Sequence, residues 1–134
     1  MLLFAIIDFS VAILVKNTLQ ASVREGVRYA VTGQTIAGAG GQDNSIKKVV
    51  QQNSLGFLTA SNASLIGITY YDPKTLATVS GTNSNAAGNV VQISVNNFSW
   101  AWMVPYARSA TALQMTAISA DMVEPSPSGV PPTR

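Results

Sequence analysis

The sequence predicts an α+β fold in which one long N-terminal helix leads into a small head, built from a short helix and an antiparallel β-sheet. Three observations predict it: a nearly uninterrupted apolar run over residues 1–15, a four-residue rhythm of apolar side chains up to Val31, and a two-residue alternation over 90–96. Apolar residues four apart share one face of a helix, whereas alternating residues lie on opposite faces of a strand. With 134 residues, the chain has room for one domain.

Few of the residues carry charge. Charged residues make up 10% of the chain and hydrophobic residues 47%, with a net charge of +2. A soluble protein typically has about a quarter of its residues charged, so we expect Asn, Ser, Thr, Gln and Gly to solvate the surface, as on an exported protein. The basic residues are scattered, and no nucleic-acid partner is expected. The chain has no Cys and no His, which excludes disulfides and thiolate metal sites and removes the commonest general base.

The first fifteen residues, MLLFAIIDFSVAILV, allow three interpretations. A signal peptide needs basic residues before its apolar run, but none precedes Lys16, and a small-residue cleavage site is missing. A membrane-spanning helix needs about 20 apolar residues, whereas this run reaches only about 22 Å. The third interpretation, which we favour, is an apolar helix that packs against other copies of itself.

Asp8 interrupts the apolar run. A carboxylate in an apolar helix is costly unless it is paired, and the nearest cation in the same helix, Lys16, lies about 12 Å along the axis. Asp8 is either a residue that ends at a membrane or domain surface, or one that meets a cation or a backbone N–H from a neighbouring subunit. We expect the second, so that Asp8 matters more for assembly than for folding of the head.

From Val15 to Val31 the helix has three faces. An apolar stripe (Val15, Leu19, Val23, Val27, Val31) separates a small-residue stripe (Thr18, Ser22, Gly26, Ala30) from a polar or basic one (Lys16, Gln20, Arg24, Arg28). Small residues four apart let another backbone approach closely, whether it belongs to a second copy or to the head folded back onto the helix. The helix is expected to end at Thr32–Gly33.

The residues assigned to an assembly interface lie on the apolar and small faces of this helix, which at roughly 48 Å is too long for the rest of the chain to cover. They are Leu3, Phe4, Ile7, Asp8, Val11, Leu14, Val15, Leu19, Ser22, Val23, Gly26 and Ala30.

Composition divides the chain into four expected segments: an N-terminal assembly or membrane helix at 1–32, a Gly-rich linker at 33–44, an α+β head at 45–123 and a Pro-rich tail at 124–134. A short helix capped by Asp43 or Asn44 is expected to begin near Ser45 and to stop near Gly56. Strands are expected over 65–71, 75–79 and 90–96, with a turn at Asp72-Pro73. Residues 110–123 fit a helix or a strand, and a last strand is favoured. The tail, with four prolines, is expected to be an extended end outside the core.

Aromatic residues concentrate in the stretch 98–106, which includes Trp100, Trp102 and Tyr106. They could form an exposed binding patch. We favour the alternative that they close the base of the head against the long helix, because aromatic side chains bury large areas and a small head without disulfides needs them.

The segment IIDFSVAILVKNTLQASVREGVRYA at 6–30 resembles the TadE-like family of pilus-associated proteins, and its part ASVREGVRYA is similar to that family's AAREGARYA segment. The alternating strand at 90–95 and the acidic segment SADMVE at 119–124 agree more weakly. The resemblance implies a pilin-like fold, export and a part in building type IV-like tight-adherence pili. Family precursors usually carry a basic leader and a Gly-containing processing site upstream, so we expect either a mature or truncated product or a leader lost by descent.

No catalytic site, cofactor or metal is expected from these residues. Asp121 and Glu124 form the only close acidic pair, and a solvated chain end accounts for them better than a metal site. No Ser lies in a GxSxG elbow, and the glycines at 38–41 lack the Lys-Ser/Thr of a phosphate-binding loop.

Two functional hypotheses remain. In the first, the chain is a structural subunit that polymerises into an extracellular, adhesive filament, held in the inner membrane before the pilus assembly machinery adds it. In the second, it is a membrane-anchored minor pilin or pseudopilin, an accessory component of pilus assembly or of a secretion machine. The short, acid-interrupted apolar run favours the first.

Overall fold

The computed structural model describes residues 2–103 and 111–134. Helix α1 (Leu2–Val31) is 30 residues long, which corresponds to about 45 Å. It ends where predicted, at a turn in which the N–H of Gly33 donates to the carbonyl of Ala30 at 3.1 Å and Gly33 takes a φ of 65°. The predicted long N-terminal helix is therefore confirmed. Met1, Tyr106 and Ala110, which the predicted elements included, lie outside the described residues.

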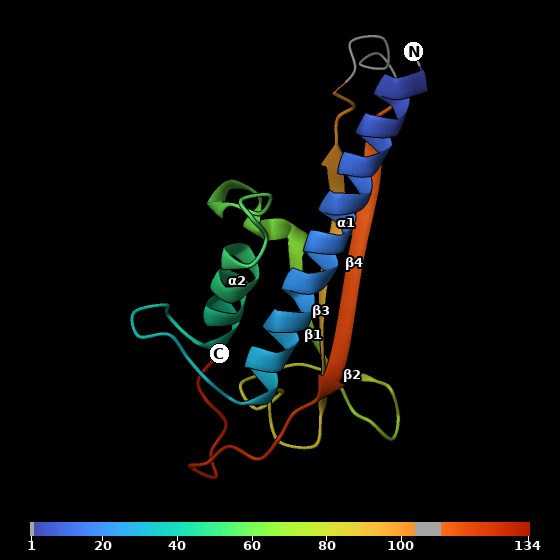
Figure 1. Cartoon of the computed structure of the whole chain (residues 1–134). Coiled ribbons are helices and arrows are strands. Elements are labelled where there is room, and N and C mark those ends of the chain that lie inside the picture. The colour runs from blue at the N-terminus through green and yellow to red at the C-terminus, as the bar shows by residue number, and fades with distance from the viewer. Residues whose placement is uncertain (1, 104–110) are drawn as a thin grey trace.

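Four antiparallel strands form one sheet in the order β2-β1-β3-β4 (Figure 1). They are β1 (Ile66–Tyr71), β2 (Thr78–Val79), β3 (Val90–Trp100) and β4 (Leu113–Met122). The predicted α+β class is confirmed, and the ambiguous segment after residue 110 is a strand, as favoured. The strand expected over 75–79 begins three residues later. The reason is that the carboxylate of Asp72 accepts hydrogen bonds from the N–H groups of Lys74 and Thr75 and closes a turn there.

Strand β3 extends beyond residue 96, where the predicted strand ended. A bulge shifts the alternation of buried and exposed residues by one position and lets the strand continue. Val95 pairs with Ala117 and Phe98 pairs with Met115, so two residues of β3 face one of β4. Asn97, inside the bulge, has a φ of 55°. The buried positions of the strand change from odd to even numbers across the bulge, and the ribbon continues to Trp100. Asn96 and Asn97 looked like the end of a strand in the sequence, but they form its kink.

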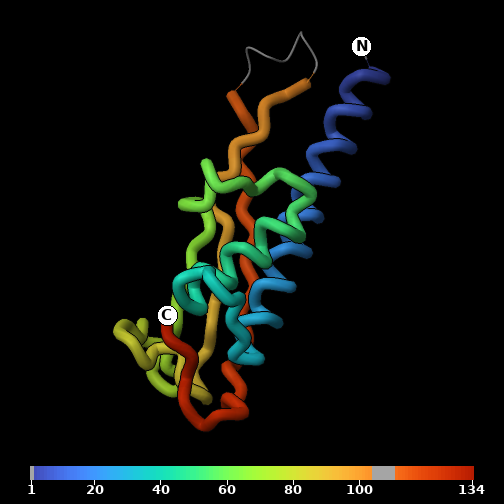
Figure 2. Tube along the Cα trace, turned by 90° about the vertical axis from the view of Figure 1, so that its left-hand side faces the viewer, coloured from blue at the N-terminus to red at the C-terminus, as the bar shows by residue number. Residues whose placement is uncertain are grey.

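The C-terminal half of α1 lies against the sheet and against α2 (Gln42–Gln52), while a 3₁₀ helix, η1 (Ala60–Leu65), leads into β1 (Figure 2). The predicted apolar stripe of α1 is buried there. The core also takes apolar residues from α2 and β3; its fully buried members include Val15, Leu19, Val23, Ile46, Val50, Val91, Ile93 and Val95. A single core thus joins the long helix to the head.

The small-residue stripe faces the head. Ser22, Gly26 and Ala30 are all buried. At Gly26 an added Cβ would overlap Cγ2 of Val50 on α2 and would lie 3.2 Å from Cδ1 of Ile93 on β3. Of the two alternatives for this stripe, the structure shows the head folded back onto it.

Helix α2 begins at Gln42, three residues earlier than predicted, and the expected side-chain cap from Asp43 or Asn44 is wrong. The N–H of Gln42 donates to the carbonyl of Thr133 at 2.7 Å, so the C-terminal tail supplies the capping acceptor. The N-cap residue is Gly41, where a Cβ would lie 2.5 Å from the carbonyl carbon of Arg134. Only a glycine leaves room for the tail at this point.

The tail at 124–134 contributes no residue to the buried core, and it is hydrogen-bonded to the rest of the chain. The N–H of Glu124 donates to the carbonyl of Val31, and Asn85 Nδ2 donates to the carbonyl of Pro132 at 2.8 Å. These bonds, together with the cap on α2, tie the tail along its length to α1, α2 and the loop before β3. The sequence missed this because backbone acceptors outside regular structure leave no residue pattern.

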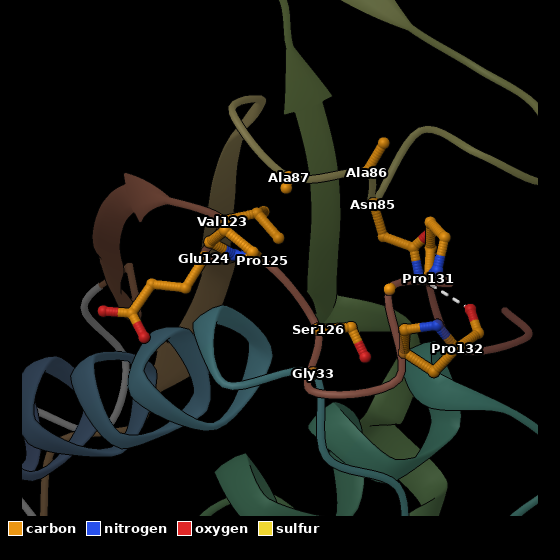
Figure 3. A pocket seen from close by; sticks show the side chains of 11 residues that line it. Gly33, Asn85, Ala86, Ala87, Val123, Glu124, Pro125, Ser126, Pro131 and Pro132 are labelled. Atoms are coloured by element: carbon orange, nitrogen blue, oxygen red, sulfur yellow. Dashed lines mark hydrogen bonds between the residues drawn. The ribbon is translucent and has the colours of Figure 1, made fainter.

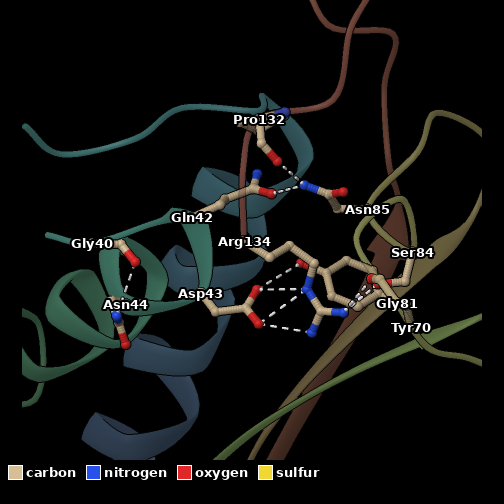
Figure 4. A network of polar contacts seen from close by, with 10 residues as sticks. All are labelled: Gly40, Gln42, Asp43, Asn44, Tyr70, Gly81, Ser84, Asn85, Pro132 and Arg134. Atoms are coloured by element: carbon tan, nitrogen blue, oxygen red, sulfur yellow. Dashed lines mark hydrogen bonds and ion pairs between the residues drawn. The ribbon is translucent and has the colours of Figure 1, made fainter.

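Arg134 joins three parts of the head through a C-terminal clasp (Asp43, Tyr70, Gly81, Ser84 and Arg134; Figure 4). Arg134 Nη2 lies 2.7 Å from Asp43 Oδ2, Nη1 donates to the Gly81 carbonyl and to Ser84 Oγ, and the guanidinium carbon lies 4.7 Å from the Tyr70 ring centroid. The hydrogen bond to Asp43 raises the pKa of Arg134, and burial raises the pKa of Tyr70 above its usual range. The clasp joins α2, β1 and the 81–84 loop.

Phe98 and Trp100 pack within the head, but their ring partner is Phe57 rather than a residue of the long helix, and Trp102 donates its indole N–H to the carbonyl of Thr111. The ring centroids of Phe98 and Trp100 lie 6.4 and 6.1 Å from that of Phe57, both edge to face. Phe57 belongs to the segment between α2 and η1. This cluster therefore fixes that segment to β3.

We predict that Gly26→Leu lowers the free energy of unfolding by about 1–3 kcal/mol or more, because the new side chain overlaps Val50. Urea unfolding of the full chain in a mild detergent measures the effect. Ala21→Leu, at an exposed position of the same helix, is the control and should stay within about 0.5 kcal/mol of the parent. Equal stability of the two variants would contradict the close packing of α1 on α2.

We predict that Arg134→Ala lowers the free energy of unfolding by about 1–3 kcal/mol, because it leaves the Asp43 carboxylate without its charged donor. Arg134→Lys should recover only part of the loss, since an ammonium group cannot donate in the same forked geometry. The same unfolding measurement applies, with exposed Arg28→Ala as the control. If Arg134→Ala and Arg28→Ala behave alike, the clasp does not stabilise the head.

Candidate assembly surface

The N-terminal half of α1 exposes large apolar side chains over most of its surface, apart from the side on which Asp8 and Ala12 are buried. In this apolar end of α1 (Leu2–Leu14), eight of them are between 46% and 78% exposed. They are Leu2, Leu3, Phe4, Ile6, Ile7, Phe9, Ile13 and Leu14. Isolated exposed apolar residues are common on proteins, but a contiguous apolar surface marks a contact with another protein or with a membrane. By length and composition, α1 is also apolar enough to cross a membrane.

The twelve residues assigned to an assembly interface separate into two groups along α1. Leu3, Phe4, Ile7 and Leu14 are exposed and Val11 is half-buried. Asp8 and the six residues from Val15 onward are buried; those six are Val15, Leu19, Ser22, Val23, Gly26 and Ala30.

The six buried residues from Val15 onward line the core of the chain's own fold, so this half of the interface assignment needs correction. Their periodicity correctly indicated a buried face. A buried face on a helix can contact either the same chain or another one, and the sequence pattern is identical in the two cases. The exposed residues before Val15 are the ones that remain available to a second molecule.

Asp8 is 3% exposed and accepts a hydrogen bond from the backbone N–H of Met103, with an Oδ1–N distance of 3.2 Å. The expectation that it would be satisfied only between subunits is therefore wrong. The N–H comes from the residues that follow β3, 95 positions along the chain. No local signal could reveal this contact, because it depends on the length of the β3–β4 ribbon and on its bulge.

Further down the helix, a second polar contact ties the same ribbon to α1. Gln20 Nε2 donates to the carbonyl of Ile118 on β4 at 2.8 Å. Together, this bond and the bond from Met103 to Asp8 hold the β3–β4 ribbon against α1 at two points, one in each half of the helix. Gln20 lies on the polar stripe of the helix, and no pattern in the sequence indicates this contact.

Two depressions lie on the surface of the described residues. One of about 280 Å³ is lined by the tail prolines, Ala86, Ala87 and Asn85, whose buried Oδ1 has no hydrogen-bond partner among the described residues (Figure 3). The other lies between α1 and β4, and Arg24, Arg28 and Glu124 are among the residues that line it.

The acidic pair near the tail does not form a metal centre in the described part of the chain. Asp121 and Glu124 are both exposed, and Asp121 Oδ1 accepts a hydrogen bond from the N–H of Met122. Across residues 2–103 and 111–134, no group of three acidic, His or Cys side chains is placed to hold a metal ion.

Residues 1–28 match the family described as TadE-like protein. The matched segment contains the whole apolar end of α1 and continues into the stripe that packs on the head. No curated protein and no solved structure matches the chain. The likeness therefore concerns α1, and the head is described by its own structure alone.

We predict that Asp8→Ala speeds hydrogen exchange of the Met103 amide by about tenfold or more, since that N–H loses an acceptor and a hydrogen bond of about 1.4 kcal/mol corresponds to a factor of ten. Asp8→Asn keeps an Oδ1 acceptor and should exchange nearly as slowly as the parent. Mass spectrometry of peptides that cover Met103 measures the rate. Unchanged exchange in Asp8→Ala would show that the contact does not hold the ribbon in solution.

Proposed function

We propose that the protein is a structural subunit of an extracellular type IV-like pilus or filament, and that it polymerises through the apolar end of α1. The observation that carries the proposal is the eight large apolar side chains exposed around this end of the helix. The likeness of residues 1–28 to the TadE-like family supports it, because the match falls on the same segment. In a filament, the apolar ends would lie in the core and the heads outside.

The energetics favour association over exposure to water. Fully burying a Leu, Ile or Phe side chain contributes about 1.5–3 kcal/mol. Burial of eight half-exposed side chains therefore contributes on the order of 10 kcal/mol, which is comparable with the about 4–15 kcal/mol lost when two molecules associate. A subunit with several neighbours in a helical array shares this surface among them, and each further contact adds to the favourable free energy of association.

Before assembly, the same surface needs an apolar environment, and a membrane provides one. Helix α1 is long and apolar enough to cross a bilayer by length and composition. We therefore place the unassembled subunit in the inner membrane, from which the pilus assembly machinery would take it up. The assembled subunit would lie in an extracellular surface filament with a role in cell adhesion. The proposal involves no catalysis and no cofactor.

The alternative is a membrane-anchored minor pilin or pseudopilin, an accessory component of pilus assembly or secretion. One observation favours it: the head covers α1 from Val15 onward and reaches Asp8, so the helix offers only its N-terminal half to a filament core. The amount of the chain in the filament separates the two hypotheses. If the chain is the main component of the filament, it is the polymerising subunit. If it is present only in trace amounts, it is an accessory component.

We predict that electron microscopy and mass spectrometry of surface material sheared from producing cells will identify this chain as the bulk component of a filament. Ile7→Asp should lower its incorporation by about tenfold or more, because it introduces a charge into an apolar contact. The control is Leu76→Asp, which changes an apolar side chain that is 75% exposed on the head. Normal incorporation of Ile7→Asp would contradict polymerisation through α1, and a chain confined to membranes would support the accessory role.

A further inference from the structure

We propose that the end of the β3–β4 ribbon is a second membrane contact, which enters the interfacial layer of a bilayer together with the apolar end of α1. We call this ribbon end the residues 100–103 and 111–113. The inference deepens the proposed function, because it rests on the insertion of α1 into a membrane before assembly. The partner of this surface is the layer of the bilayer in which the lipid headgroups meet the acyl chains.

The ribbon end and the N-terminus of α1 lie at the same end of the molecule in both views (Figures 1 and 2). The N–H of Met103 donates to Asp8, and Gln20 donates to the carbonyl of Ile118. These bonds hold the β3–β4 ribbon alongside α1 toward the N-terminal end of the helix. The C-terminus and the clasp lie away from this end (Figure 1).

The depth of insertion leads to the proposal. For the exposed side chains as far as Leu14 to leave water, the membrane surface must lie beyond Leu14. Asp8 stands six residues before Leu14, which places it about 9 Å deeper along the helix axis. Asp8 then passes below the membrane surface, and Met103, which is bonded to it, goes with it.

The residues of the ribbon end suit this environment. Met103 is 57% exposed, and Trp102 is half-buried with its indole N–H donated to the carbonyl of Thr111 at 3.2 Å. Tryptophan is enriched at membrane interfaces because its ring is amphipathic. Within 96–103 no residue is charged.

Charge is segregated in the described structure. At the end formed by Leu2–Val15 and residues 96–103, the one ionisable side chain is Asp8, which is buried and hydrogen-bonded. From Lys16 onward α1 carries three cations that are all exposed, Lys16, Arg24 and Arg28. A carboxylate inside a membrane is tolerated when protein groups satisfy it. The ribbon end thus shields Asp8 from lipid, which explains how an acid can stand within the apolar run.

The chain contains only two tryptophans, Trp100 and Trp102, which gives the test a built-in reporter. In the Trp100→Phe variant, the aromatic contact with Phe57 is retained and Trp102 is the single emitter. The full chain is reconstituted from detergent into phosphatidylcholine vesicles that carry bromine at shallow or deep positions of the acyl chains. Flotation shows whether it binds, and fluorescence reports the depth of Trp102.

We predict a blue shift of the Trp102 emission and stronger quenching by shallow than by deep bromines. Vesicle-bound protein with unshifted, unquenched Trp102 would overturn the ribbon contact and leave the insertion of α1 standing. Failure of the chain to bind vesicles would overturn both. A blue shift without bromine quenching that grows with protein concentration would show a second copy at the ribbon end, and would also overturn the proposal.

A pair of matched variants separates the ribbon end from the rest of the surface. Met103→Ser keeps the backbone N–H that donates to Asp8 and removes an exposed apolar side chain, so we expect partitioning into vesicles to fall by about threefold to tenfold. Leu76→Ser removes an apolar side chain that is even more exposed, at 75%, from the far part of the head and should leave partitioning unchanged. Equal partitioning of the two variants would overturn the ribbon contact.

Discussion

Packing of the C-terminal half of α1 against the chain's own sheet and second helix is the interaction on which the rest of the structure depends. The apolar stripe beginning at Val15 is buried against β3, β4 and α2, and Gly26 lets α2 approach where any side chain would overlap Val50. The N-terminal half of the helix is covered on the side of Asp8 and Ala12, and its large apolar side chains from Leu2 to Leu14 are exposed. One continuous helix therefore connects a folded head to an apolar end, and a rigid connection of this kind transmits the orientation of one to the other.

The β3–β4 ribbon links these two halves. Its bulge at Asn96–Asn97 moves the buried positions from one parity to the other, so that Phe98 packs on Phe57 and the strand can continue beyond the head. The continuation brings the N–H of Met103 to Asp8. A buried carboxylate without partners would destabilise the helix by several kcal/mol. The ribbon removes much of that cost, and the acid in turn fixes where the ribbon ends relative to the apolar end of α1.

The opposite end of the head is closed without disulfides. The tail caps α2 through the Thr133 carbonyl, and Arg134 joins Asp43 on α2 to Tyr70 on β1 and to the loop before β3. A small domain lacks the buried area of a large one and needs such additional ties. The clasp supplies them with one guanidinium group, whose planar fork can donate in several directions at once.

Local pattern alone determined the class of the fold, the long helix and its end at Gly33, three of the strands, and which face of α1 is buried, because side-chain periodicity reports secondary structure and burial directly. It could not say what buries that face, and half of the residues assigned to assembly, from Val15 to Ala30, pack inside the chain. The partner of Asp8, the bulge that extends β3, the tail on α2 and the clasp of Arg134 join residues far apart in the sequence. Such contacts depend on strand register and backbone position in three dimensions, and only the tertiary structure decided them.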